Sequence, residues 1–243
     1  MAWSLTRPPS TGPDPAEDLA AAALALARRF AHGATMWCVS PDWPSHSRHV
    51  AVEFVHPVIV GTRALPTVSI EADDLAGALR EVVRPGDVLL ALSTAEAPGV
   101  GDLLLRSEAW GLTTVWLGLG PRPLTDRADH VVWAPGSGVE TGARSGDLVV
   151  LYHLLWELTH VVLEHRGLLE EPPEESSRHD VCITCSDEGR VAEVAGVGDG
   201  GVIEVRVGGQ REEVDASLAG TVEIGDLLLV HAGVALSRLG RER

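Results

Sequence analysis

Two different hydrophobic periods divide the chain. Up to about residue 166, short apolar runs alternate with longer stretches in which apolar residues recur every three or four positions. This is the pattern of buried strands alternating with amphipathic helices. The expected strands are 34–39, 65–70, 87–92, 113–117 and 130–133, and the expected helices are 14–32, 45–56, 73–83, 100–110 and 144–166. Such an alternation predicts an α/β domain, a doubly wound parallel sheet with helices on both faces.

The period changes to two in the last quarter of the chain. Apolar and polar residues alternate in 190–197, 202–207, 212–218 and 226–231, and glycine pairs between them predict tight turns. Short strands of this kind close into a small OB-like β-barrel. Residues 234–243 are expected to form a short helix or a tail.

The composition between the two patterns predicts a linker. Residues 167–179 are acidic and Pro-rich, and residues 1–13 are rich in Pro, Ser and Thr, so neither stretch has much to bury. We therefore expect four parts in the chain: a mobile N-terminus 1–13, an α/β domain 14–166, a linker 167–179 and a barrel domain 180–243.

The charge balance restricts the partners. The 243 residues carry a formal charge of −16, and the pI is near 4.9. Nucleic acids and anionic membrane surfaces require basic patches, so neither is expected as a partner. There are three cysteines, two of them three residues apart, which is the pattern of a cytosolic protein with metal or redox thiols. Because no apolar run reaches the length of a membrane span, we expect a cytoplasmic protein without a membrane span.

Candidate metal ligands open and close the barrel domain. Cys182 and Cys185 precede its first strand, and His231 ends its fourth. Thiolate and imidazole suit iron, zinc or copper better than calcium or magnesium. The residues alone leave three alternatives open: a zinc site that also uses His179, a redox pair, and a His231 that is only a surface residue.

A second candidate site consists of polar residues at helical spacing on two expected helices of the first domain. The first stripe holds His46, His49, Glu53 and His56, and the second holds His153, Glu157 and His160. Residues three and four apart share one helix face, so each stripe could supply metal ligands or an acid–base pair. A polar interface rim would produce the same spacing.

The barrel domain resembles the HypC/HupF-type chaperones of [NiFe]-hydrogenase maturation. The resemblance covers about residues 180–239 and is carried by Cys-Ile at 182–183 and by Val-His-Ala-Gly at 230–233. It implies that Cys182 and His231 hold an iron fragment, Fe(CN)2CO, together with a scaffold protein, before delivery to the hydrogenase large subunit. Two departures are clear: Cys182 follows 181 residues instead of being N-terminal, and Cys185 stands where the family has Pro or a small residue.

The first domain resembles the SIS (sugar isomerase) domains of the phosphoheptose isomerase type over about residues 16–166. The matching stretches are His-Val-Ala-Val-Glu at 49–53, the strand at 65–69 and the late helix. The resemblance implies that His49, Glu53 and His153 bind zinc or move the substrate proton, with Glu53 as the candidate base. It also implies a homodimer. The ligand-binding positions that it suggests are Ser93, Thr94 and Ser145.

The loops that would bind phosphate depart from the isomerase pattern. Val-Ser-Pro-Asp-Trp at 39–43 replaces a glycine-rich loop, and Pro41 has no N–H to offer an anion. Asp42 and Glu96 add negative charge. The sequence thus leaves enzyme activity open but argues against it, and it favours an accessory protein of hydrogenase maturation. The alternatives are a zinc-dependent sugar-phosphate isomerase and a docking module with a zinc or redox staple.

Overall fold

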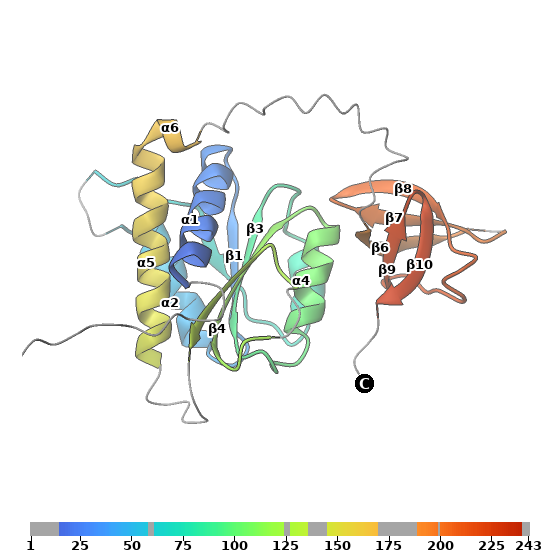
Figure 1. Ribbon diagram of the computed structural model, residues 1–243, viewed down its shortest axis with the longest axis horizontal. Helices are drawn as coiled ribbons and strands as arrows, with labels where there is room; N and C mark the ends of the chain where they lie inside the picture. The colour runs from blue at the N-terminus through green and yellow to red at the C-terminus, as the bar shows by residue number, and fades with distance from the viewer. Residues whose placement is uncertain are drawn as a thin grey trace, which may run out of the picture.

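The first domain is built on a parallel sheet of five strands. The computed structural model describes residues 15–57, 61–123, 127–135, 145–169, 189–198 and 200–239. The strands lie in the order β2-β1-β3-β4-β5 (Figure 1). Their bounds are Thr67–Ser69 (β2), Met36–Val39 (β1), Val88–Ser93 (β3), Thr113–Gly120 (β4) and His130–Pro135 (β5). Every strand pair is parallel, as the alternation of strands and helices predicted.

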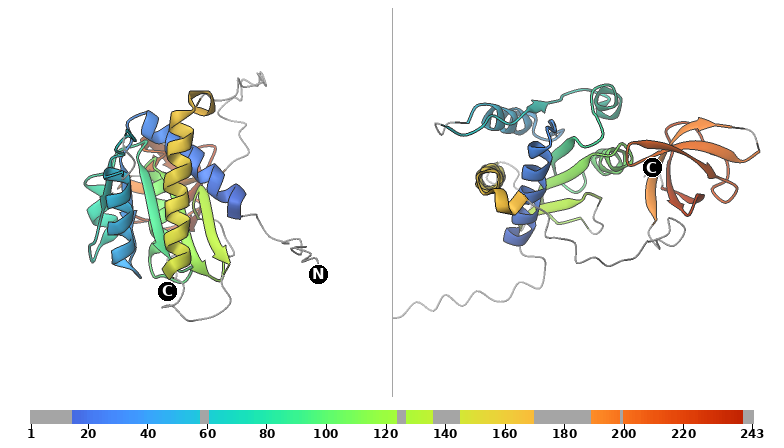
Figure 2. Two further views of the ribbon diagram at one scale, coloured as in Figure 1. Left: turned by 90° about the vertical axis from the view of Figure 1, so that its left-hand side faces the viewer. Right: turned by 90° about the horizontal axis from the view of Figure 1, so that it is seen from above.

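Helices cover both faces of this sheet (Figure 2). One face packs against α1 (Pro15–Ala31), α2 (Pro44–Val55) and α5 (Ser145–Glu164), and the other packs against α3 (Leu75–Arg80) and α4 (Val100–Ala109). All six residues of β3 are buried, because a central parallel strand contacts helices on both sides. The predicted doubly wound α/β fold is confirmed.

Helix α5 corrects the expectation that no segment is long enough to cross a membrane. By length and composition alone, its residues 146–164 would suffice. Leu148, Tyr152 and Leu155 nevertheless pack into the core between α5 and the sheet. The short helix α6 (Arg166–Leu169) follows it, so the first residues of the expected linker are helical. The rest of that stretch lies outside the described residues.

The C-terminal domain is a closed barrel of five strands in the order β10-β8-β7-β6-β9. Their bounds are Arg190–Val197 (β6), Val202–Val207 (β7), Gln210–Asp215 (β8), Leu227–His231 (β9) and Val234–Leu239 (β10). The inward residues of β6 and β7, such as Ala192 and Val205, form a separate apolar core. The expected barrel is confirmed. The expected helix or tail after residue 233 was wrong, because β10 pairs with β9 and closes the ring.

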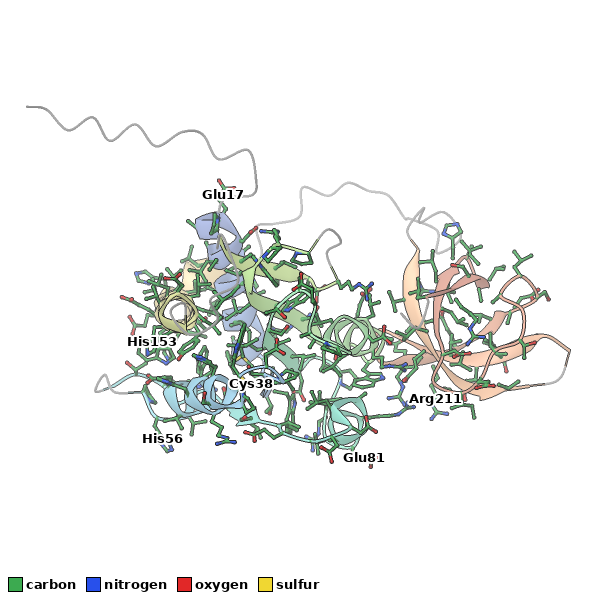
Figure 3. The ribbon with its side chains drawn as sticks, turned by 90° about the horizontal axis from the view of Figure 1, so that it is seen from below. Glu17, Cys38, His56, Glu81, His153 and Arg211 are labelled. Atoms are coloured by element: carbon green, nitrogen blue, oxygen red, sulfur yellow. The ribbon has the colours of Figure 1, made fainter. Side chains whose placement is uncertain are left out.

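The barrel lies against the first domain beside α4 (Figures 1 and 3). Helix α4 contacts β6 and β7. The centre of this contact is Glu193 of β6, a carboxylate that side chains of the first domain surround.

Candidate functional site

Two of the predicted stripe residues on α2 and one on α5 meet at the surface of the first domain. His49 Nε2 lies 3.2 Å from Glu53 Oε1, and His153 Nε2 lies 3.7 Å from the same oxygen. The ligand atoms of these three residues all lie within 4.8 Å of one another. Figure 3 shows His153 on α5 where this helix runs beside α2. Two imidazoles and one carboxylate at this separation form a donor set that zinc accepts.

In both imidazoles Nδ1 has a hydrogen-bond partner outside the cluster, so Nε2 is the nitrogen that faces Glu53. His153 Nδ1 lies 2.7 Å from the carbonyl oxygen of Val149, and because a carbonyl only accepts, this nitrogen carries the proton. His49 Nδ1 lies 3.2 Å from the hydroxyl of Tyr152. Partners behind the ring of this kind fix the orientation of metal-binding histidines. The side chains of His49 and His153 are 44% and 40% exposed, so the site is open to solvent.

Tyr152 is the member of this site that the sequence did not reveal. Burial of the phenol, and then the charge of Glu53, raise the pKa of Tyr152 to about 12. Its ring also stacks on that of His153, with centroids 4.9 Å apart. The only signal in the sequence was its position next to His153 on an apolar helix.

The other stripe residues lie elsewhere. The ring of His46 lies edge-on to that of Tyr152, and burial, followed by the nearby His49, lowers the pKa of the His46 imidazole. His56 ends α2 as an exposed residue, and Glu157 is exposed on α5. His160 is buried, and its two ring nitrogens lie near the carbonyl oxygens of Trp156 and Arg63. The helical spacing identified the correct helix faces but included residues that do not join the cluster.

The two loops whose sequences depart from the phosphate-binding pattern are joined by a carboxylate. Asp42 follows β1, and its Oδ2 accepts hydrogen bonds from the backbone N–H of Thr94 (3.0 Å) and from its hydroxyl (3.1 Å). Asp42 therefore occupies a backbone donor of the kind that a phosphate oxygen uses in a loop of this type. Ser93, the preceding residue, is buried and accepts a hydrogen bond from Trp116 Nε1 at 2.9 Å. Ser145 begins α5.

At the barrel, the register places the incoming chain beside His231. Arg190 pairs with Val230 in the antiparallel β6–β9 ladder, so Gly189 lies opposite the half-buried His231. Cys182, Cys185 and His179 lie outside the described residues. Cys38, the third cysteine, is buried in β1, and this burial raises the pKa of its thiol.

Comparison with known proteins finds a similarity for each domain. Residues 188–243 match the model of the HupF/HypC family. The first domain is similar to a phosphoheptose isomerase from Francisella tularensis (TM-score 0.53, 11% identity) and to one from Neisseria gonorrhoeae (TM-score 0.51, 15% identity). Each similarity covers 60% of this chain and 86% of the isomerase. At these identities the likeness establishes the fold alone. No curated protein sequence matches the chain. The chain therefore joins a domain with the fold of the phosphoheptose isomerases to a barrel that matches the HupF/HypC family.

Proposed function

We propose that this protein is an accessory chaperone of [NiFe]-hydrogenase maturation whose barrel carries an iron fragment. The observation that carries the proposal is the HupF/HypC match over residues 188–243. The register of β6 and β9 supports it, because it brings the segment after the two cysteines to the end of the barrel where His231 lies. Cys182 and His231 are the proposed ligands of the Fe(CN)2CO cargo, with Cys185 close by in sequence.

The proposed partners follow from the same role. A maturation scaffold protein would share the cargo, and the hydrogenase large subunit would receive it. These steps belong to the cytoplasm, where we place the protein. The acidic surface, with a formal charge of −16, favours partners that present basic patches.

The iron content of anaerobically purified protein tests this role. We expect iron with cyanide and carbonyl bands in the infrared spectrum, lost in Cys182→Ala and strongly reduced in His231→Ala. Cys185→Ala is the matched control, because the chaperone role requires Cys182 far more than Cys185. Equal losses in both cysteine variants, with zinc in place of iron, would indicate a zinc staple. Unchanged iron and scaffold binding in Cys182→Ala would refute the proposal.

A second candidate function is that of a zinc-dependent sugar-phosphate isomerase. It rests on the cluster of His49, Glu53 and His153. The cluster fits zinc because both imidazoles turn Nε2 toward Glu53. Bound zinc would polarise a substrate oxygen, and Glu53 is the residue placed to move a proton. The contact between Asp42 and Thr94 weighs against phosphate binding.

Zinc binding and turnover separate this candidate from the chaperone role. Loss of one imidazole should weaken zinc binding in His49→Ala by at least about tenfold, whereas His56→Ala, an exposed histidine of the same segment, should leave it unchanged. Turnover of sedoheptulose 7-phosphate that disappears in Glu53→Gln would establish an isomerase. Zinc bound without turnover would leave a structural metal site in a domain that no longer catalyses.

The outer face of α5 supports a homodimer. Val150, Leu154 and Val161 are 56%, 40% and 42% exposed, and their spacing of four and seven puts them on one stripe of the helix. Exposed apolar stripes of this kind are found at contacts between protein chains. We propose that two copies pair through this stripe.

A further inference from the structure

One charged residue of the barrel is buried although the strand pattern points it outward. Ala192 and Val194 of β6 belong to the apolar core of the barrel. Since successive side chains of a strand point to opposite faces, Glu193 between them points away from that core. Its side chain is nevertheless only 2% exposed. The atoms that cover it come from the first domain.

Three donors from the first domain converge on this one carboxylate. Trp110 Nε1 donates to Oε2 at 2.8 Å, and Arg80 Nη1 lies 3.0 Å from the same oxygen. Arg106 Nη1 donates to Oε1 at 3.0 Å and also to the carbonyl oxygen of Gly225 at 2.6 Å. A buried carboxylate is tolerated only when cations and hydrogen bonds satisfy its oxygens, and here both oxygens are satisfied across the domain boundary.

The two backbones also touch beside this cluster. The N–H of Gly209, in the turn between β7 and β8, donates to the carbonyl oxygen of Ala109 at 2.9 Å. A Cβ added at Gly209 would lie 2.6 Å from Pro85 Cγ and 2.8 Å from the carbonyl oxygen of Trp110. A Cβ added at Gly111 would lie 2.7 Å from the carbonyl oxygen of Gly208. Glycine on both sides permits this close approach.

We infer that the outer face of β6, with the β7–β8 turn, is a docking surface whose partner is the α3–α4 side of the chain's own first domain. The two domains form one unit in solution, held by Glu193. In the closed strand order, β8 and β10 are the strands that do not neighbour β6. While the two domains are docked, the outer face of β6 is covered and is not available to another protein. The inference concerns the full chain alone and holds whether or not the barrel carries iron.

The rate of amide hydrogen exchange in the full-length protein measures whether the two domains stay docked. The Gly209 N–H bonds across the boundary, whereas the Ala216 N–H bonds within the barrel, to the Gly201 carbonyl oxygen at 2.8 Å. In Glu193→Ala we expect Gly209 to exchange at least about tenfold faster, as a locally opened amide does, while Ala216 is unchanged. The radius of gyration from small-angle X-ray scattering should rise. Arg211→Gln is the matched control, because Arg211 pairs with Glu204 of the same domain on the exposed surface of the barrel.

Two further variants keep the test decisive if Glu193→Ala disturbs the barrel itself. Arg106→Gln weakens the same cluster from the first domain and should also accelerate Gly209 exchange. Gly209→Ala should raise the radius of gyration, whereas Gly200→Ala should not. Gly200 has a similar positive φ (+77° against +82°), but an added Cβ there meets nothing within 4 Å. Unchanged Gly209 exchange and an unchanged radius of gyration in both Glu193→Ala and Arg106→Gln would overturn the inference.

Discussion

Tyr152 shows how one residue joins the core to the candidate metal site. The residue is 1% exposed, yet its hydroxyl lies 3.2 Å from His49 Nδ1. A phenol is neutral at physiological pH even with its ordinary pKa, and the raised pKa of Tyr152 extends this to more alkaline pH, so it can hydrogen-bond to the imidazole without adding charge beside Glu53. A phenol in this position orients His49 and leaves its Nε2 facing Glu53.

The titration of Tyr152 can be followed directly, since the chain has one tyrosine and no lysine. The midpoint of the rise in tyrosinate ultraviolet absorbance should lie at about pH 12 in the folded protein and at about pH 10 in denaturant. Because the folded state holds this proton more tightly, the associated stability is complete below the unfolded pKa and is lost as the pH rises through 12. Tyr152→Phe should lose less stability over this interval. A folded-state midpoint equal to that in denaturant would contradict the prediction.

Sequence reasoning at the residue scale succeeded where a side chain belongs to a repeating face. The spacing of His49 and Glu53 placed both on one side of α2. It could not supply Tyr152 or Asp42, whose roles depend on contacts between segments far apart in the chain. Glu193 was beyond sequence reasoning for the same reason, because a charged residue at an outward strand position normally faces water.

At the scale of elements, the Asp87 carboxylate hydrogen-bonds to the starts of two neighbouring strands, β1 and β3. Its Oδ1 accepts from the Thr35 N–H at 2.9 Å, and its Oδ2 accepts from Trp37 Nε1 and the Arg84 N–H, each at 3.0 Å. The residue is 7% exposed. Its removal leaves three donors near the starts of β1 and β3 without this acceptor.

We therefore expect Asp87→Ala to lower the free energy of unfolding of the first domain by about 3 kcal/mol, because hydrogen bonds to a charged group are lost while the donors of Thr35 and Trp37 stay partly buried. Urea denaturation followed by tryptophan fluorescence measures it. The exposed Asp73 provides the control, and Asp73→Ala should change stability by less than about 0.5 kcal/mol. Equal effects of the two substitutions would show that Asp87 does not hold the strands.

Element prediction failed at β10 for a physical reason. A bulge between Ala235 and Ser237 shifts its register against β9, and Leu236 is 44% exposed. The alternation of buried and exposed residues that marks β7 is therefore broken in β10. Strands whose pairing requires a bulge give a weak period-two signal.

At the scale of the whole molecule, the stripe on α5 predicts how two copies assemble. Sedimentation of the full chain at micromolar concentration should give a dimer, and Leu154→Glu should give a monomer because it buries a charge in an apolar contact. Val82, 43% exposed, follows α3 on the opposite face of the sheet. Val82→Glu should leave the dimer intact. A monomeric parent protein would refute pairing through α5.

The bond between Asp42 and Thr94 has a consequence for how the first domain supports the barrel. Asp42 supplies a covalently attached anion to the loop after β3, so this loop needs no metabolite to satisfy its N–H. Helix α4 begins shortly after that loop and ends at the barrel. The position of α4, and with it the surface that the first domain offers to the barrel, is thus supported by a contact within the chain itself.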